Sequence, residues 1–461
     1  MTKTSLPSVD LIREAFHYQS RFDGSTMVFK IDFPVTQDPA FSYLMKDLAL
    51  LARTGFRVVI VPGAKERIDA VLQEYRIVSQ YRGESRITTA AAIPFVEMAA
   101  FDVATRFITG LSADRVDAVI GNFVRARGLG VCEGLDMENT GTVDRILTDS
   151  IQRVLHLGMV PILPCIGWSP SGKPYNVPSD EIALAASGAL GAVKLFIISV
   201  HEGLRTGAYA IPKHIEVGAT GRIVRLTPLE VEAILETNEL LQGPGIQDRP
   251  LQELRLALHA SKAGVERVHI IDGREEGAVL RELFSNLGAG TMVYADEYEA
   301  IRPLKTADIP GILRLMEPLV QQGNLVRRTP KQIQEKRGDY VVFEIDGSVH
   351  ACGALHHWGE GQGEIAAVAT DPAYTDMGLG RRIVRYLIDR AIKQDLHRVF
   401  VLTTHTHDWF EFLGFTECGV ESLPECRRKQ YDRIRKSKIF ALDLVAVIEG
   451  TVLAINLSDA P

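Results

Sequence analysis

The sequence has few cysteines, and they form no motif. Its 461 residues contain five, which are Cys132, Cys165, Cys352, Cys418 and Cys426. None belongs to a CxxC pair, and an odd number of scattered cysteines is typical of reduced thiols in a cytoplasm. No set of histidines and cysteines has the spacing of zinc ligands, so we expect no metal site.

Long apolar runs and an excess of positive charge are also absent. The first twenty residues lack the apolar core of a signal peptide, and no apolar run is long enough to span a bilayer. The net charge of −7 and the pI near 6.0 give no electrostatic reason to expect nucleic acid. We therefore expect a cytoplasmic protein, bound to neither membrane nor nucleic acid, whose substrate is a small metabolite.

The length suits two or three domains. From about 25 to 297, short apolar runs at 26–33, 57–63, 160–168 and 192–200 alternate with helical segments. This alternation predicts an α/β domain with a parallel sheet covered by helices on both faces. Between 298 and 445 the pattern of expected elements changes. Residues 340–355 read as two strands joined by Asp346-Gly347, a hairpin signal that favours an α+β domain. Residues 446–461 have no partner pattern and are expected to form a tail.

The most informative stretch is 369–394. A strand ends, Gly378 and Gly380 close a loop, and a helix with apolar positions at helical spacing follows. Glycines at the start of a helix let backbone N–H groups approach an anion such as a pyrophosphate, which the helix dipole favours. Taken alone, this pattern fits a plain structural turn about as well.

The segment 400–415 adds a strand, a short aromatic helix and Gly414-Phe415. The two segments in this order resemble the GNAT acetyltransferase superfamily, which implies acetyl-CoA as co-substrate. One departure is Thr375, which stands where the superfamily usually has Arg or Gln. The resemblance assigns coenzyme contacts to Val368, Ala369, Thr375, Gly378, Leu379, Gly380 and Arg381.

Three further stretches, 321–333, 363–372 and 421–440, resemble the bacterial N-acetylglutamate synthases. The resemblance implies transfer of an acetyl group to the α-amino group of L-glutamate, the first step of arginine biosynthesis. A substrate with two carboxylates requires cationic forks to hold it. The resemblance places substrate contacts at Leu325, Arg327, His405, Arg435 and Ser437.

The chemistry also requires removal of a proton, because only the free amine attacks a thioester. The resemblance assigns the general base to Glu364 and a hydroxyl donor for the leaving thiolate to Thr406. Backbone N–H groups of Val368 and Ala369 are expected to stabilise the oxyanion. Ala367 stands where some members have Cys, which favours direct attack. From composition alone, the basic run 427–438 reads as a solvated face and Glu364 as a surface carboxylate.

The first domain resembles the amino-acid kinase fold through 62–69, 121–136, 175–185 and 268–293. Active members have a K-x-G-G turn after the first strand, whose glycines admit phosphate oxygens. Here Lys30 remains, but Asp32 and Phe33 replace the glycines, and no lysine occurs between His214 and Ser261. Since phosphoryl transfer depends on positioning and cationic stabilisation, we predict no kinase activity.

The resemblance implies that this domain binds arginine and regulates the enzyme. The implied arginine contacts are Tyr18, His269, Glu282, Gly288, Gly290, Thr291 and Met292. Without the resemblance, His269 would read as the end of a core strand and Glu282 as a surface helix residue. The resemblance also implies a homo-oligomer, a hexamer, in which residues 1–24 form a helical arm.

Three alternatives stay open at this point. The chain could acetylate another amine, although Arg327 and Arg435 would repel a polyamine. It could be an arginine sensor with a degenerate acetyltransferase domain, an interpretation that Thr375 and Ala367 favour. It could also be a bifunctional synthase and kinase, against which the missing glycines and lysine argue.

Overall fold

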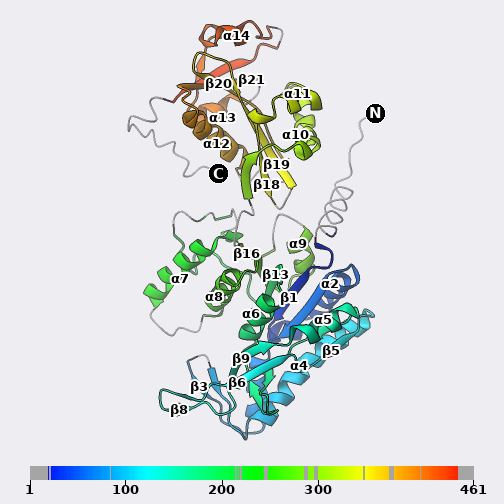
Figure 1. Cartoon of the computed structure of the whole chain (residues 1–461). Coiled ribbons are helices and arrows are strands. Elements are labelled where there is room, and N and C mark those ends of the chain that lie inside the picture. Colours follow the sequence, from blue (N-terminus) through cyan, green and yellow to red (C-terminus); the bar gives the residue numbers. More distant parts are fainter. Residues whose placement is uncertain are drawn as a thin grey trace. The chain divides into compact units, whose positions relative to one another are not determined.

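The structure is a computed structural model in which the chain forms two compact units, Met1–Asp296 and Glu297–Pro461 (Figure 1). The described residues are 19, 22–83, 85–212, 215, 217–218, 221–242, 248–284, 289–294, 299–345, 348–372, 378–404, 406–433 and 435–444. Most of the expected arm at 1–24 and all of the expected tail at 446–461 lie outside these residues.

The first unit is built on an eight-stranded sheet with the order β14-β16-β15-β13-β1-β2-β10-β5. Neighbouring strands run parallel except for β15 and β16. The strands are β1 (Thr26–Ile31), β2 (Arg57–Pro62), β5 (Ala118–Ile120), β10 (Val160–Ile162), β13 (Lys194–Ser199), β14 (Arg225–Leu226), β15 (Arg267–Asp272) and β16 (Thr291–Tyr294). The predicted α/β sheet is confirmed.

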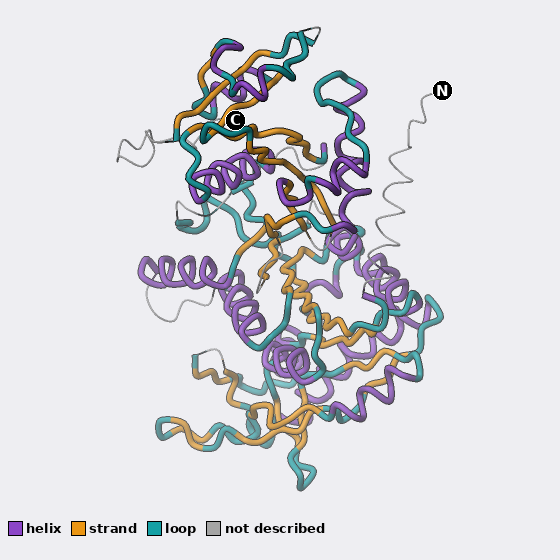
Figure 2. The backbone as a smooth tube through the Cα atoms, turned by 45° about the horizontal axis from the view of Figure 1, so that its top comes forward, coloured by secondary structure: helices purple, strands orange, loops and turns teal. Residues whose placement is uncertain are grey.

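Helices cover both faces of this sheet (Figures 1 and 2). Alternate residues of β1 enter two cores, because successive side chains of a strand point to opposite faces. Met27 and Phe29 pack with α2, α3, α4 and α9, while Val28 packs with α5 to α8. The helices are α2 (Phe41–Arg53), α3 (Lys65–Glu74), α4 (Ile93–Ala113), α5 (Thr148–His156), α6 (Ser179–Ala189), α7 (Pro228–Gln242), α8 (Arg249–Lys262) and α9 (Ala278–Phe284).

A smaller four-stranded sheet, which the sequence did not reveal, follows the order β12-β11-β6-β9. Its strands are β6 (Val124–Gly128), β9 (Gly141–Ile146), β11 (Ile166–Trp168) and β12 (Pro174–Asn176). The apolar run 160–168 is therefore two strands in two sheets. Pro164 lies between them and has no N–H for a ladder hydrogen bond. Two hairpins complete the unit: β3 (Gln80–Arg82) with β4 (Ser85–Ile87), and β7 (Val131–Cys132) with β8 (Leu135–Asp136).

The second unit contains a seven-stranded sheet with the order β17-β18-β19-β20-β21-β23-β22. All neighbours are antiparallel except β20 and β21. The strands are β17 (Glu299–Pro303), β18 (Tyr340–Ile345), β19 (Ser348–His357), β20 (Gln362–Thr370), β21 (Arg398–Thr403), β22 (Thr416–Cys418) and β23 (Lys438–Asp443). The predicted α+β fold of this unit is confirmed. Strands β18 and β19 pair as a hairpin, although Asp346 and Gly347 lie outside the described residues.

Helices lie on both sides of β19 in this unit. Cys352 and Ala354 pack with α10, whereas a side chain on Gly353 would meet Ile383 of α12. The helices are α10 (Ile309–Gln321), α11 (Pro330–Glu335), α12 (Leu379–Lys393), α13 (His407–Phe412) and α14 (Glu425–Arg428). The apolar face of α12 thus packs against the middle of the sheet, and this packing holds the first turn of the helix in place.

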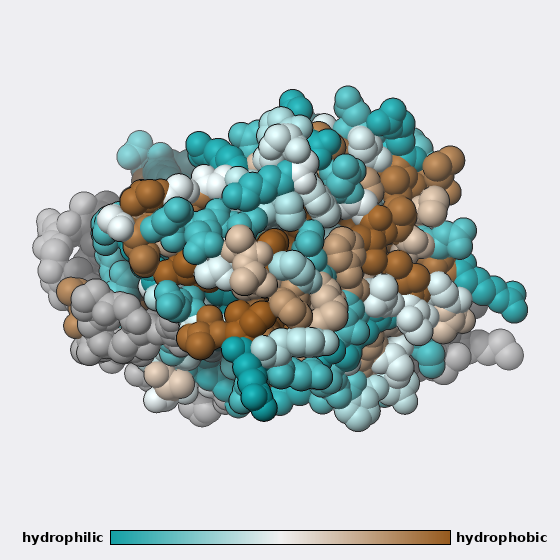
Figure 3. All heavy atoms as spheres, turned by 90° about the horizontal axis from the view of Figure 1, so that it is seen from below, coloured by the Kyte–Doolittle hydropathy of each residue, from teal (hydrophilic) through white to brown (hydrophobic). Residues whose placement is uncertain are grey.

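No described helix is both long and apolar enough to cross a bilayer, and no three described His, Cys, Asp or Glu residues are grouped to hold a metal ion. The five cysteines are free thiols. Figure 3 shows one face, on which apolar side chains lie among hydrophilic ones.

Candidate active site and effector region

The second unit has an opening in its sheet between β20 and β21. These parallel strands pair only over Gln362–Glu364 and Arg398–Phe400, after which no pairing connects them. The rest of β20 pairs with β19 alone, at Ile365, Ala366, Ala369 and Thr370. Half of β20 therefore presents a strand edge on which an extended ligand can form backbone hydrogen bonds.

A β-bulge lies on the same half of β20. The register shifts between Cys352 and Ala354 of β19, so that Ala367 and Val368 together face Gly353. Ala367 has a φ of 55°, a left-handed conformation that a bulge accommodates. The bulge turns backbone groups next to Val368 and Ala369 out of the regular ladder, at the place where the sequence led us to expect oxyanion donors.

Helix α12 begins beside this edge. Its N-cap, Gly378, has a φ of 59°, which glycine adopts without a steric penalty. Leu379 is buried and anchors the first turn, while Gly380 lies near Trp409, and the Arg381 guanidinium lies 5.3 Å from the centre of the Phe412 ring. The first turn of a helix can accept an anion through backbone N–H groups that have no partner within the helix. Thr375 lies outside the described residues.

A cavity of about 580 Å³ adjoins the pairing end of β20. Four of the five predicted substrate residues, Leu325, Arg327, Arg435 and Ser437, line it together with the predicted general base Glu364. Its cationic lining residues are Arg327, Arg328, Lys336, Arg427 and Arg435. A concentration of guanidinium groups around one cavity suits a ligand with carboxylates.

The two predicted arginines differ in their surroundings. Arg327 is exposed and pairs with Glu317 at 2.7 Å. Arg435 donates through Nη2 to the carbonyl oxygens of Gly323 and Asn324, at 3.0 and 2.7 Å. Its buried Nε has no hydrogen-bond partner among the described residues. Arg435 is therefore held in place while keeping an unused donor.

Glu364 is buried at the cavity wall and is already hydrogen-bonded. Arg427 grips both of its oxygens, with Nε to Oε2 at 2.7 Å and Nη2 to Oε1 at 3.0 Å. The Trp358 indole N–H donates to Oε2 at 2.7 Å. From the sequence, Arg427 was read only as part of a solvated basic run, and Trp358 lies outside the stretches that carry the resemblance.

A second buried pair at this cavity was also missed. His356 on β19 is the cross-strand neighbour of Glu364, and its Nδ1 bonds Oδ2 of Asp339 at 2.6 Å. Burial lowers the pKa of His356, and Asp339 only partly opposes this effect. A histidine on the inward face of an apolar strand was the available signal, since buried polar groups need partners.

Thr406 lies apart from the cavity lining. It is the N-cap of α13 at the end of β21, and its hydroxyl bonds that of Thr403 at 2.8 Å. This position is on the diverging side of the opening between β20 and β21. His405 lies outside the described residues.

In the first unit, His269 and Glu282 form a buried pair. Nδ1 of His269 bonds Oε1 of Glu282 at 2.7 Å, and Lys194 reaches Nε2 at 3.3 Å. Burial first, and then Lys194, lowers the pKa of His269 to about 4, against the opposing effect of Glu282. The other Glu282 oxygen accepts the backbone N–H groups of Ala289 and Gly290. An arginine ligand would have to compete for these acceptor sites.

The remaining predicted effector residues surround this pair unevenly. Met292 is the cross-strand neighbour of His269. Gly290 has no space for a side chain, because a Cβ would lie 1.9 Å from the Ile270 carbonyl oxygen. Thr291 donates instead to the Ile223 carbonyl oxygen at 2.6 Å. Tyr18 and Gly288 lie outside the described residues.

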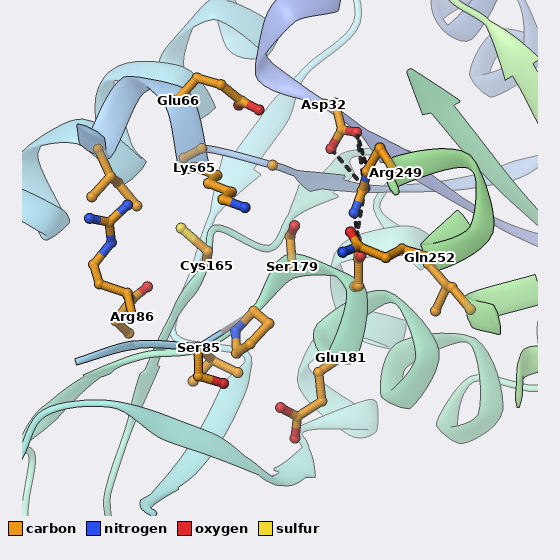
Figure 4. A pocket seen from close by; sticks show the side chains of 18 of the residues that line it. Asp32, Lys65, Glu66, Ser85, Arg86, Cys165, Ser179, Glu181, Arg249 and Gln252 are labelled. Atoms are coloured by element: carbon orange, nitrogen blue, oxygen red, sulfur yellow. Dashed lines mark hydrogen bonds and ion pairs between the residues drawn. The ribbon is translucent and has the colours of Figure 1, made fainter. Parts of the chain in front are cut away.

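A second cavity, of about 670 Å³, opens where phosphate would bind in a kinase of this fold (Figure 4). Fully buried Lys30 pairs with Asp180 at 2.9 Å and with Asp32. Arg249 of α8 joins Asp32 at 3.0 Å and Asp180 at 2.8 Å. The stretch between His214 and Ser261 has no lysine, and Arg249 of this stretch joins the cluster instead. Asp32 thus places its own carboxylate on the cations that a phosphate would need.

Two family models match the chain. The model of the amino acid kinase family matches residues 31–213, and that of the acetyltransferase (GNAT) family matches residues 312–415. The fold and the site therefore define a class of protein, a GNAT acetyltransferase joined to an amino-acid-kinase-like unit.

Curated relatives narrow the class. An amino-acid acetyltransferase of Pasteurella multocida (strain Pm70) is 32% identical over 437 residues, which cover 94% of this chain and 96% of the relative. One of Escherichia coli (strain K12) is 33% identical over 453 residues, covering 96% and 99%. The chain belongs to the amino-acid acetyltransferase family.

Solved structures agree with this assignment. N-acetylglutamate synthase from Neisseria gonorrhoeae, complexed with coenzyme A and L-arginine, has a TM-score of 0.81 and 28% identity, covering 94% of this chain and 99% of that chain. The same synthase complexed with coenzyme A and N-acetyl-glutamate has a TM-score of 0.58 and 30% identity, covering 95% and 99%.

Proposed function

We propose that this chain is an N-acetylglutamate synthase, which transfers the acetyl group of acetyl-CoA to the α-amino group of L-glutamate in the first step of arginine biosynthesis. The observation that carries the proposal is the arginine-rich cavity next to the open edge of β20. A dicarboxylate is the amine substrate that such a lining favours. The similar gonococcal synthase, solved with coenzyme A and N-acetyl-glutamate, supports it.

Glutamate would be held by its two carboxylates. Arg435 is the better-prepared fork, because its backbone contacts fix it and its Nε is unused. Arg327 would have to exchange Glu317 for a substrate carboxylate. Holding both acid groups orients the amine toward the thioester, which lowers the entropic part of the barrier. Leu325, His405 and Ser437 complete the proposed substrate contacts.

Acetyl-CoA would lie along the open edge of β20 with its pyrophosphate at the start of α12. The dipole of a fifteen-residue helix and the backbone N–H groups of its first turn suit that anion. Backbone N–H groups of Val368 and Ala369 would stabilise the oxyanion, and Thr406 would donate to the leaving thiolate. The proposed pyrophosphate contacts are Thr375, Gly378, Leu379, Gly380 and Arg381.

Glu364 would receive the ammonium group of glutamate and relay its proton. Its carboxylate lines the cavity and is fixed by Arg427 and Trp358. The amine nitrogen, once free, would attack the thioester carbonyl directly, since Ala367 offers no nucleophile. No step of this route calls for a metal ion.

L-arginine would bind in the first unit and regulate turnover, which the arginine complex of the gonococcal synthase supports. Arginine can act only if it binds one state of the protein better than another. The family precedent is inhibition. The proposed contacts are Tyr18, His269, Glu282, Gly288, Gly290, Thr291 and Met292.

The proposed setting is the cytoplasm, in which the free thiols stay reduced. The proposed assembly is a homo-oligomer, a hexamer by resemblance, with residues 1–24 as its helical arm. Light scattering of the full chain measures the assembly directly.

One assay tests the function. Coenzyme A release is followed with glutamate, spermidine or a lysine peptide as acceptor, with and without arginine. We expect turnover with glutamate alone and a decrease when arginine is added. Turnover of the peptide but not of glutamate would refute the proposal. Stabilisation by arginine without any acetyl transfer would instead identify an arginine sensor.

A further inference from the structure

The cavity proposed for glutamate holds a histidine that the function described above does not use. His356 lines the cavity, is 7% exposed, and lies on β19 directly opposite Glu364 of β20. Directly opposite residues of antiparallel strands have Cβ atoms only about 5 Å apart. The two side chains therefore share one wall of the cavity.

Asp339 fixes the protonation of this imidazole. A carboxylate only accepts hydrogen bonds, so the 2.6 Å contact to Asp339 places the ring proton on Nδ1. Nε2 then carries the lone pair. In the part of the chain that the structure describes, Nε2 has no hydrogen-bond partner. The imidazole thus presents an unused acceptor, held in a single tautomer.

Glu364 is in the opposite situation. Both of its oxygens accept from Arg427, and one accepts from Trp358 as well. A proton that stayed on Glu364 would disrupt a bidentate pair with a guanidinium, which is among the strongest hydrogen-bonded arrangements in proteins. Glu364 is therefore well placed to attract an ammonium group and poorly placed to keep its proton.

The groups around His356 favour its neutral form. Burial lowers its pKa, and Lys336 of the loop after α11 acts in the same direction. Asp339 and Glu364 raise the pKa but do not offset burial. Tyr340 packs edge-on at 5.8 Å between ring centres. Arg427, which is paired with Glu364, places a further positive charge at the same wall.

We propose that His356, oriented by Asp339, is the proton acceptor of the acetyl transfer in place of Glu364, and that Glu364 positions the ammonium group beside it. This inference rests on the proposed function. One proton passes from the ammonium nitrogen to Nε2, and the freed lone pair forms the C–N bond to the acetyl carbonyl. The C–S bond breaks, the thiolate takes the second proton that the nitrogen loses and leaves as the coenzyme A thiol, and His356 returns its proton to water.

The test compares the pH dependence of kcat in three full-length variants. In the wild type, kcat falls as the pH drops through the His356 pKa, since the protonated imidazole accepts nothing. We expect His356→Gln to lower kcat on the order of 10²–10⁴-fold, the usual contribution of a general base, with KM for glutamate changed only a few-fold. The remaining activity should lack this acidic limb.

Two variants control the experiment. His357→Gln changes the adjacent, exposed histidine on the other face of β19 and should leave kcat and its pH profile unchanged. Asp339→Asn keeps the imidazole but removes the carboxylate that orients it, so we expect an intermediate loss of kcat. Thermal melting and coenzyme A binding by calorimetry establish that each variant is folded.

The outcomes separate the two proposals. If the wild type does not acetylate glutamate, the proposed function fails. If the wild type is active and folded His356→Gln keeps both its kcat and its acidic limb, the assignment of His356 is wrong while the function stands. Should His356→Gln not fold, an unchanged kcat and pH profile in folded Asp339→Asn overturns the assignment.

Discussion

At the scale of single residues, the second unit shows how partners decide what a charged side chain can do. Arg327 and Arg435 belong to the same expected fork, yet one pairs with Glu317 in solvent and the other is fixed on backbone carbonyls. An exposed ion pair is worth little, while a fixed and partly buried donor is ready to bind. The two arginines should therefore contribute unequally.

This difference leads to a prediction for substrate binding. Arg435→Met should lower kcat/KM for glutamate about 10- to 100-fold, from the loss of a charge-assisted hydrogen bond of about 1.5–3 kcal/mol. Arg327→Met should have a smaller effect. Steady-state kinetics with glutamate measures both. Lys438→Met, an exposed change in the same basic segment, should leave kcat/KM unchanged. Equal activity of wild type and the double arginine variant would contradict the proposed fork.

His269 gives a residue-scale prediction about stability. Its pKa is lowered from 6.5 to about 4 in the folded state, so the unfolded chain binds the proton more readily. Its contribution to the free energy of unfolding is present above pH 6.5 and is lost as the pH falls from 6.5 to about 4. The loss is about 3 kcal/mol. Urea unfolding across this pH range, with exposed His259→Gln as control, measures the slope; a flat profile would contradict it.

At the scale of elements, the ends of strands carry the chemistry of both units. In the first unit, β1 ends at Ile31, so Asp32 lies where a kinase of this fold would admit phosphate. Burial works against the charge of Asp180, yet Lys30 and Arg249 more than offset this and lower its pKa. In the second unit, β20 and β21 stop pairing after Glu364. The end of β1 is thus filled by ion pairs between the protein's own side chains, whereas the end of β20 is open.

The filled strand end supports a prediction about phosphoryl transfer. With Lys30 and Arg249 engaged by Asp32 and Asp180, the cations have no capacity for a transferred phosphate. ATP turnover in the presence of N-acetylglutamate should stay at background, whereas acetyl transfer by the same sample proceeds. Phosphorylation of N-acetylglutamate would show that Asp32 moves aside and would restore the bifunctional alternative.

At the scale of the whole molecule, each unit has cores and a candidate ligand region of its own. Arginine bound in the first unit can therefore change acetyl transfer in the second unit only if it binds more tightly to one of two states of the protein than to the other. The same coupling requires glutamate or coenzyme A to alter arginine affinity by the same factor.

Arginine should therefore stabilise the full chain. At about 100 times its Kd, a ligand that binds only the folded state adds about 2.7 kcal/mol. Differential scanning calorimetry should show a higher Tm with L-arginine and no shift with L-lysine, which lacks the planar fork that Glu282 would bind. Glu282→Gln should reduce the shift. Equal shifts with both amino acids would argue against the proposed effector site.

The sequence by itself determined the order of the two folds, because strand and helix periodicity and a few glycines are local properties. It also pointed to Arg435 and Glu364, since they lie in segments with a family resemblance. Only the tertiary structure brought in Arg427, Trp358 and the His356–Asp339 pair, which come from separate elements and meet through the pairing of β19 with β20. Likewise, only folding showed that Arg249 reaches Asp32, 217 residues earlier in the chain. Spacing along a chain predicts an element, whereas the partners of a buried charge depend on which elements pack together.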